Sequence, residues 1–421
     1  MKVLYFHQHF TTPRGASGTR SYEFARHLIG EGHEVTMVCG SSSKADTGLT
    51  GPFRRGRREG GVEGIRVIEL EVPYSNYDGF VKRAWAFLRF ALRSIGIALR
   101  EEYDVVFATS TPLTAGIPGI AARWLRRKPF VFEVRDLWPE LPKAMGVITN
   151  PVVLTLMSWL EWASYHSAHR LIGLSPGIVE GIVRRGIDED RVTMIPNGCD
   201  LELFDPKRYD RGAVDIPGVG PDDFVAAFTG AHGIANGLDA VLDAAAVLKD
   251  RGRNDIKIVF IGDGKLKPRL VARATEDGLD NCIFLDPVPK EELARMMVRV
   301  DVGLMILDNV PAFYRGTSPN KFFDYIASGT PVLNNYPGWL AQLIEEHRCG
   351  VAVEPGDALA FAECLEGAQS ERDSTPQPSP AALGLARHFS RSVLADAFHL
   401  HLRRSVGEEP RRAVQDPDAA S

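Results

Sequence analysis

Charged and aromatic residues follow directly on an apolar strand pattern in the segment FEVRDLWPE, residues 132–140. Arg135, Asp136 and Glu140 are costly to desolvate unless polar groups lie among them. Ligands of α/β proteins bind beyond the carboxyl ends of the strands. The segment therefore predicts a polar ligand at this edge of a sheet, whereas the alternative is that Asp136 and Glu140 cap the following helix.

A second segment whose side chains could bind a ligand is YRGTSPNKFFDYIASGTPVLN, residues 314–334. Thr317 and Ser318 fall where a helix is predicted to begin, and hydroxyls there cap free N–H groups. Lys321 and Asp324 are three residues apart and share a face of that helix. A helix N-terminus with one lysine neutralises a diphosphate, and the carboxylate suits vicinal ribose hydroxyls. The alternative is a surface helix with a Lys–Asp pair.

Small-residue loops follow several predicted strands. Gly15 and Gly18 precede a helix whose first turn exposes N–H groups, which suits an anion or close approach of a ligand. Gly230 in FTGAHG and Gly262 in FIGDG repeat the arrangement, and two such loops at one sheet edge make a phosphate cradle. The alternative for the first loop is a tight β–α turn, because it lacks the P-loop lysine.

The elements that must position these residues are predicted from alternating patterns. Short apolar runs alternate with helix-like segments from the first residue, which predicts a parallel sheet covered on both faces. The alternation restarts after a linker rich in Gly, Pro and Asp at 205–222. We predict an α/β protein with two doubly wound domains, 1–205 and 206–375, then a helix at 381–404 and a disordered tail at 407–421.

Composition excludes several classes of protein. A net charge of −5 argues against a nucleic-acid partner, because phosphate backbones select basic surfaces. The five cysteines are scattered without C-x-x-C spacing, so neither a metal site nor a disulfide framework is indicated. The first residues do not form a secretory leader, and no apolar run is long enough to span a membrane. We expect a cytoplasmic protein.

Residues 81–100, VKRAWAFLRFALRSIGIALR, have the pattern of a basic amphipathic helix. Lys82, Arg89, Arg93 and Arg100 fall close to one line along it, and apolar residues occupy one side. A helix of this kind binds anionic lipid, which predicts a peripheral contact with the inner membrane face. The alternative is a buried crossover helix whose arginines reach out to solvent.

Taken in order, GHEVTMV, FEVRDLWPE, MIPNGCDLELF and SPNKFFDYIASGTPVL resemble glycosyltransferase family 4, the retaining GT-B enzymes. The resemblance covers residues 1–370 and is strongest to bacterial O-antigen, capsule and exopolysaccharide sugar transferases, including amino-sugar transferases. It implies two Rossmann-like domains facing a central cleft. It also implies a UDP-sugar donor on the C-terminal domain, an acceptor on the N-terminal one and no metal cofactor. The helix at 381–404 would cross back to the N-terminal domain.

The resemblance also implies roles for individual residues. Arg135, Asp136 and Glu140 would be catalytic, and Trp138 would stack on a sugar face. The donor diphosphate and sugar would contact Gly15, Gly18, Gly230, His232, Thr317, Ser318 and Lys321. The nucleoside would contact Gly262, Val288 and Asp324. In a front-face reaction the leaving diphosphate takes the acceptor proton, while the protein stabilises the developing charge.

Three positions depart from the family pattern. Arg135 stands where the family commonly has a histidine. The Arg and Lys that clamp the diphosphate are replaced by Ala231 or His232 and by Asn236. The paired glutamates become Gly316 and Asp324. Phosphate neutralisation is then expected to rest on Lys321 and backbone N–H groups.

These observations predict a retaining transferase that moves a hexosyl or N-acetylhexosaminyl group. The acceptor would be a glycan or a polyprenyl-diphosphate-linked sugar in surface polysaccharide synthesis. One alternative is a non-hydrolysing nucleotide-sugar epimerase of the same fold. Another is a catalytically silent partner in a polysaccharide assembly complex, which the missing clamp residues favour.

Overall fold

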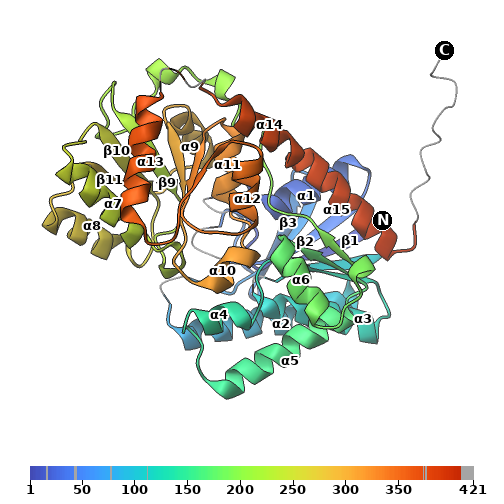
Figure 1. Cartoon of the computed structure of the whole chain (residues 1–421). Coiled ribbons are helices and arrows are strands. Elements are labelled where there is room, and N and C mark those ends of the chain that lie inside the picture. Colours follow the sequence, from blue (N-terminus) through green and yellow to red (C-terminus); the bar gives the residue numbers. More distant parts are fainter. Residues whose placement is uncertain are drawn as a thin grey trace, which may run out of the picture.

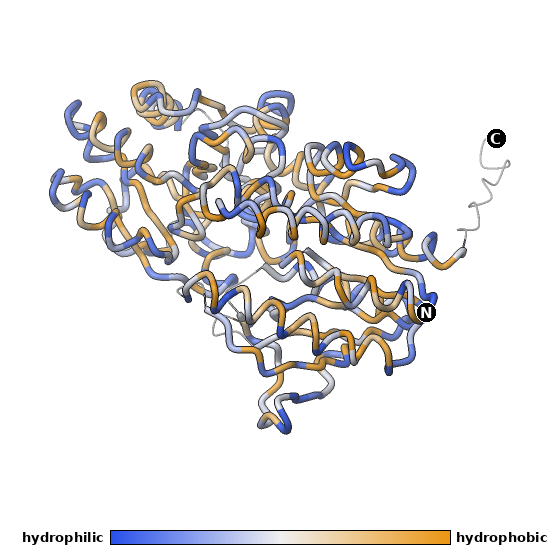
Figure 2. The backbone as a smooth tube through the Cα atoms, turned by 90° about the horizontal axis from the view of Figure 1, so that it is seen from below, coloured by the Kyte–Doolittle hydropathy of each residue, from blue (hydrophilic) through white to orange (hydrophobic). Residues whose placement is uncertain are grey.

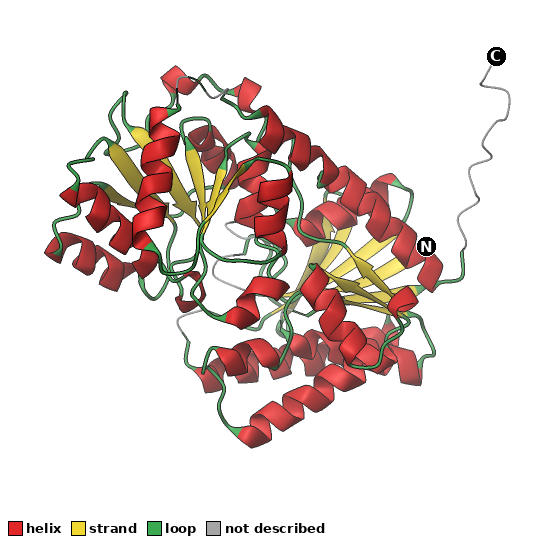
Figure 3. Cartoon of the chain, in the orientation of Figure 1, coloured by secondary structure: helices red, strands yellow, loops and turns green. Residues whose placement is uncertain are grey.

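The chain folds into two α/β lobes, seen side by side in the computed structural model (Figures 1 and 3). The structure describes residues 1–15, 18–41, 45–75, 78–110, 112–372, 374 and 377–408. Residues 16 and 17 of the first small-residue loop lie outside the described residues. So does nearly all of the predicted tail, from 409 to 421.

The first lobe is built on an eight-stranded sheet with the order β3-β4-β2-β1-β5-β6-β7-β8. Its strands are β1 Lys2–Phe6, β2 Glu34–Gly40, β3 Arg57–Val62, β4 Ile65–Leu70, β5 Val105–Thr109, β6 Phe130–Val134, β7 Arg170–Gly173 and β8 Val192–Met194. All neighbours are parallel except β3, which pairs antiparallel with β4. The sequence did not predict β3, because RREGGV lacks an apolar run; a tight turn at Glu63 and Gly64, both with positive φ, places it.

Helices cover both faces of this sheet. They are α1 Arg20–Gly30, α2 Phe80–Arg100, α3 Gly116–Leu125, α4 Glu140–Ala144, α5 Pro151–Ser167 and α6 Pro176–Arg184. Helices α2, α3 and α5 lie together in one layer at the bottom of Figure 1, and α1 lies on the opposite face. A buried ion pair ties α1 to the sheet, because Arg20 of α1 donates to Glu133 of β6 at 2.8–2.9 Å.

The second lobe has a six-stranded parallel sheet with the order β11-β10-β9-β12-β13-β14. Its strands are β9 Phe224–Thr229, β10 Ile256–Ile261, β11 Cys282–Leu285, β12 Val302–Met305, β13 Val332–Asn334 and β14 Gly350–Ala352. Its helices are α7 Asp239–Asp250, α8 Lys267–Glu276, α9 Lys290–Met297, α10 Pro311–Gly316, α11 Asn320–Ala327, α12 Trp339–Glu346 and α13 Ala358–Ser370. Two doubly wound sheets confirm the predicted fold class.

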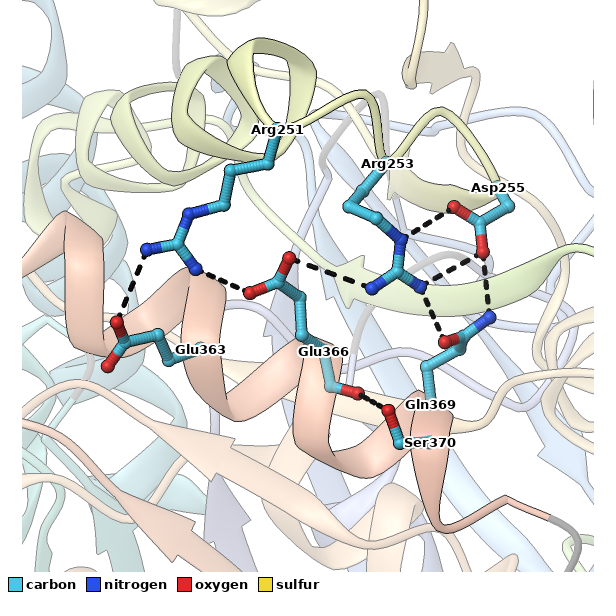
Figure 4. A network of polar contacts seen from close by, with 7 residues as sticks. All are labelled: Arg251, Arg253, Asp255, Glu363, Glu366, Gln369 and Ser370. Carbon is cyan, nitrogen blue, oxygen red and sulfur yellow. Dashed lines mark hydrogen bonds and ion pairs between the residues drawn. The ribbon is translucent and has the colours of Figure 1, made fainter.

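A polar network fixes α13 beside α7 (Figure 4). Arg251 pairs with Glu363 at 3.2 Å and with Glu366, and Arg253 pairs with Asp255 at 3.0 Å. Glu366 also lies 3.6 Å from Arg253, so a single carboxylate joins the two arginines. Isolated surface pairs contribute little, whereas shared charges in a network hold their side chains with less loss of entropy per pair.

The C-terminal segment differs from the prediction of one helix at 381–404. It forms α14 Pro380–His388 and α15 Arg391–Ser405. Ser390 interrupts the helical pattern, because its hydroxyl accepts from the Val393 N–H at 3.3 Å and caps α15. Helix α14 packs on α11 of the second lobe, whereas α15 packs on α1 of the first. There the Phe398 ring stacks on Phe24 with centroids 4.4 Å apart.

Candidate active site

A cavity of about 730 Å³ lies between the lobes, at the carboxyl ends of β1, β9 and β10. The structure brings several predicted site residues to it: Gly15, Gly18, Gly230, Gly262, Val288, Lys321 and Asp324. The sequence did not single out other lining residues: Asp46, Asp263, Lys290 and Asn320. Residues from both lobes therefore meet at one site.

Gly230 and Gly262 form the predicted pair of neighbouring loops. Their φ angles are 129° and 151°, a backbone region that favours glycine. A Cβ on Gly262 would lie 1.9 Å from the carbonyl oxygen of Gly230. The two loops pack backbone against backbone at the cavity wall, which leaves room for a ligand to approach the main chain.

The first lobe reaches the second through the loop at Gly18. A Cβ on this residue would lie 2.9 Å from the side-chain amide nitrogen of Asn320, which begins α11. Any larger residue would therefore press against the opposite lobe. Gly18 therefore permits the close approach of the two lobes at the cavity.

Lys321 is a half-buried cation of the cavity wall. Its Nζ donates to Asn236 Oδ1 at 3.1 Å and lies 3.7 Å from the centre of the Phe228 ring. A Cβ on Gly230 would lie 3.4 Å from Lys321 Cε, so the lysine lies against the glycine loop. Burial lowers the pKa of Lys321 to about 7. An anion bound here would stabilise the charged form of the lysine.

The surface-helix alternative required an ion pair between Asp324 and Lys321, and Asp324 instead pairs with another lysine. Its carboxylate accepts from Lys290 Nζ at 2.9 and 3.0 Å, and the Asp324 side chain is only 7% exposed. Lys290 begins α9, far from Asp324 in sequence. The sequence signal for Lys290 was weak: it is a lysine at the start of a helix, directly after the segment PVP. The pair closes the cavity beside Val288.

A cluster of nitrogen bases lies at the carboxyl ends of β1 and β6. Burial, and next the charge of Arg135, lower the pKa of His7 well below its usual range and that of His9 to about 4. Arg135 is held by its backbone N–H, which donates to Ser110 Oγ at 2.8 Å. Among the described residues, the buried His7 Nδ1 and both polar atoms of the Gln8 side chain lack a hydrogen-bond partner. Such groups call for a ligand or water.

Asp136 and Glu140 are not brought to the larger cavity. They line a smaller one of about 190 Å³, together with Glu180, Arg184, Arg315 and Thr317. Burial raises the pKa of Asp136, and Arg135 opposes this shift. Glu140 lies on the short helix α4, 3.7 Å from Arg184. Trp138 lines neither cavity, because its ring packs half-buried against the core of the first lobe.

The predicted capping by Thr317 and Ser318 is wrong. Helix α11 begins at Asn320, after Pro319, without a side-chain cap. Ser318 instead joins the lobes, since its hydroxyl accepts from the backbone N–H of Asn197 at 3.0 Å. Thr317 ends α10. A proline before the helix keeps both hydroxyls away from its free N–H groups.

His232 is not placed as a diphosphate ligand. Its side chain is fully buried among Phe228, Phe260 and Phe284, with ring centroids 5.9–6.3 Å away. Burial lowers its pKa to about 4, followed by the charges of Lys267 and Lys321. A neutral imidazole in an aromatic pocket supports the glycine loop from behind and does not line the cavity.

Comparison with known proteins assigns both lobes. A model of the glycosyl transferase 4-like domain matches residues 15–198, and one of glycosyl transferases group 1 matches 223–370. The chain joins a 4-like domain to a group 1 domain. Sucrose-phosphate synthase of Thermosynechococcus elongatus superposes with a TM-score of 0.72 at 17% identity, over 96% of this chain and 98% of that one. Anabaena HepE, solved with UDP, superposes with a TM-score of 0.66 at 16% identity, over 96% of this chain and 100% of that one. The fold is GT-B.

Curated relatives match less of the chain. The D-inositol 3-phosphate glycosyltransferase of Nocardia farcinica is 29% identical over 222 residues, which are 51% of this chain and 47% of that protein. The chain thus spans about half the length of the curated relatives it matches. Within the described residues, no helix combines the length and the apolar character needed to cross a bilayer.

The 4-like and group 1 domains touch at Gly177 of α6, where a Cβ would lie 2.2 Å from the carbonyl oxygen of Arg315. Gly177→Ala is therefore expected to open the lobes at this edge. We expect the radius of gyration to rise in solution scattering. Gly367→Ala, at a helical glycine with open space around it, is the matched control. Unchanged scattering from Gly177→Ala would contradict the close approach.

Proposed function

We propose that the chain is a retaining glycosyltransferase that moves a hexosyl or N-acetylhexosaminyl group from a UDP-sugar. The observation that carries the proposal is the position of Lys321, half-buried beside Gly230 and Asn236 in the larger cavity. HepE, a protein of the same fold, was solved with UDP and with UDP-glucose, which supports a uridine donor. The acceptor is a glycan or a polyprenyl-diphosphate-linked sugar of surface polysaccharide synthesis.

The group 1 domain holds the donor. Lys321 neutralises the diphosphate beside the Gly230 and Gly262 loops, because a cation held at the cavity wall binds an anion strongly. Asp324 accepts hydrogen bonds from the ribose hydroxyls beside Val288. Lys321 thereby replaces the clamp cations that the sequence lacks after FTG, so the silent-partner alternative is not needed.

The 4-like domain holds the reacting sugar and the acceptor. In the proposed step the bond from C1 to the diphosphate oxygen breaks, and the acceptor oxygen bonds to C1 on the same face. The acceptor proton moves to the departing phosphate oxygen, so atoms and charge balance. Arg135, beside the neutral His7 and His9, stabilises the phosphate charge as it develops.

The smaller cavity is the proposed acceptor site. Asp136, Glu140 and Glu180 supply carboxylates, and Arg184 and Arg315 supply cations, within about 190 Å³. Carboxylates accept hydrogen bonds from sugar hydroxyls, and guanidinium groups bind phosphate. The catalytic roles first expected for Asp136 and Glu140 thus become acceptor contacts.

Calorimetric titration with UDP, GDP, ADP and dTDP, each with and without EDTA, tests the donor assignment. We expect UDP to bind most tightly and EDTA to leave its affinity unchanged. Tight binding of another nucleotide would assign the donor to that nucleotide instead of UDP. A loss of binding in EDTA would overturn metal-free binding of the diphosphate. Product analysis without acceptor then separates a transferase from an epimerase, because only an epimerase would convert the sugar.

Asp324→Asn tests the ribose contact. The substitution keeps the shape and removes the charge, so UDP should bind more weakly by about 1–3 kcal/mol. The sharper measurement compares UDP with 2′-deoxy-UDP. The unchanged protein should discriminate between them, and the variant should bind both alike. Asp250→Ala, at an exposed acid of α7, is the control. Equal discrimination in both proteins would remove Asp324 from the ribose site.

A further inference from the structure

Four of the six tryptophans of the chain gather on one exposed surface. Trp85 on α2, Trp124 on α3, and Trp159 and Trp162 on α5 are each at least half exposed. These helices form one layer of the 4-like domain, and Figure 2 shows the molecule from the side of that layer. We call this layer the α2–α3–α5 face. Exposed aliphatic and aromatic residues extend it: Phe80, Val81, Leu88, Leu92, Leu99, Leu125, Val152 and Leu156.

The folded domain does not need these side chains. Helix α2 packs on the sheet with its other side, through Ala86, Phe90 and Ile97, which are buried. Its outward side carries Trp85, Leu88 and Leu92. Residues 81–100 therefore form a crossover helix with one free apolar side, and the membrane contact of this helix stays a prediction. Contiguous exposed apolar patches of this kind mark interaction surfaces.

The charge of the α2–α3–α5 face has one sign. Helices α2 and α3 contain no acidic residue, and the only acid of α5, Glu161, is buried and paired with Arg185 at 2.7 Å. The acids at the ends of α2 are all in ion pairs: Asp78, Glu101 and Glu102. Lys82 is paired with Asp78, and the other basic residues of α2 and α3 are Arg83, Arg89, Arg93, Arg100 and Arg123. Among the described residues, Arg89 and Arg100 have no acidic partner.

Helix α2 of the face contacts the polar cluster at the carboxyl end of β1. The His9 ring lies 4.8 Å from Tyr74, and Tyr74 stacks on Phe87 of α2 with centroids 5.4 Å apart. After burial, the charge of Arg135 also lowers the pKa of His9. A row of aromatic rings thus links the carboxyl end of β1 to the first half of α2.

We propose that the α2–α3–α5 face lies on an anionic lipid bilayer, with its four tryptophans at headgroup level. Tryptophan favours the membrane interface, since its ring is apolar and its N–H remains hydrogen-bonded. The arginines and lysine bind anionic headgroups, which explains why the face excludes free acids. A protein partner does not require a single sign of charge over three helices. The proposal extends well beyond the helix at 81–100 and does not depend on the identity of the donor.

Sedimentation with lipid vesicles tests the proposal on the full chain. One set contains phosphatidylcholine alone, and the other contains one-third phosphatidylglycerol. We expect binding to the anionic vesicles, with a blue shift of tryptophan fluorescence. Trp159→Ser/Trp162→Ser should lower the vesicle partition coefficient at least about tenfold, because two exposed rings of the face are lost. Both rings lie on α5, so this variant leaves the basic helix α2 unchanged. Arg89→Glu/Arg100→Glu should remove the preference for anionic lipid.

The controls separate this proposal from the donor assignment and from misfolding. Val351→Ser/Val393→Ser changes exposed apolar residues away from the face and should leave vesicle binding unchanged. UDP affinity, measured for each variant, reports folding and should also be unchanged. No binding of the unchanged protein to anionic vesicles would overturn the proposal. So would a Trp159→Ser/Trp162→Ser variant that dissociates an oligomer in light scattering and still binds vesicles.

Discussion

Lys321→Met is expected to weaken UDP binding roughly 10- to 100-fold, since a hydrogen bond to a charged group contributes about 1.5–3 kcal/mol. The loss should be larger for UDP than for UMP, because the lysine faces the loops proposed to hold the diphosphate. The variant should nevertheless melt at a higher temperature. Burial lowers the pKa of Lys321 from 10.5 to about 7, so the folded protein disfavours the charged lysine. Methionine removes that cost.

The same shift predicts a pH dependence. The folded pKa lies below the unfolded value, so the destabilisation by Lys321 is complete below pH 7 and fades as the pH rises toward 10.5. The melting temperatures of the two proteins should converge over that range. UDP affinity should fall by up to about tenfold per pH unit above pH 7, because the free lysine loses its proton while the phosphates stay ionised. In Lys321→Met this pH dependence should be absent.

Lys265→Met, at an exposed lysine on the neighbouring loop, controls for loss of net charge. Differential scanning calorimetry and UDP titration from pH 7 to 9 give all the required quantities. Equal losses for UMP and UDP would place the lysine away from the outer phosphate. A lower melting temperature would show that the lysine is charged and paired in the free protein.

Arg135→Ala is expected to lower turnover about 10²–10³-fold while UDP affinity stays the same. Removing one group that stabilises developing charge costs this much in comparable sites. Arg135 does not line the larger cavity, so its removal should not change the affinity for UDP. Arg135→Lys should recover part of the turnover, because it restores the charge and not the planar geometry.

NMR titration of His9 gives a readout that does not need the substrate. Its pKa of about 4 arises first from burial and then from Arg135. In Arg135→Ala the pKa should rise and remain below 6.5. Arg127→Ala, at an exposed arginine of the same domain, should change neither turnover nor this pKa. Weaker UDP binding by Arg135→Ala would instead make Arg135 a donor ligand.

The lobes and the glycine loops were predictable because their signals are local. Apolar runs at strand and helix periods report which elements form, and Gly230 and Gly262 mark backbone that other residues rarely adopt. Lys321 and Asp324 were predicted from one helix segment, and both line the larger cavity. The order of parallel strands then brings the loop ends to one edge.

The remaining features depend on residues that meet only in three dimensions. Asp324 pairs with Lys290 of another helix, and no spacing in the sequence encodes that pair. His232 follows a glycine in a predicted loop, yet three phenylalanines of adjacent strands bury it. Ser318 bonds to Asn197 of the opposite lobe. Side-chain direction and contact between lobes decide these cases, and hydrophobic periodicity reports neither.

The crossing of α15 bears on how the chain is made. Phe398 stacks on Phe24 and meets Phe107 with centroids 4.8 Å apart, so the last described helix completes the aromatic core of the first lobe. During synthesis this lobe leaves the ribosome long before α15 does, and its aromatic wall is open meanwhile. The second lobe folds between these two events. The nascent chain must therefore keep this unfinished aromatic surface from aggregating until α15 has been synthesised.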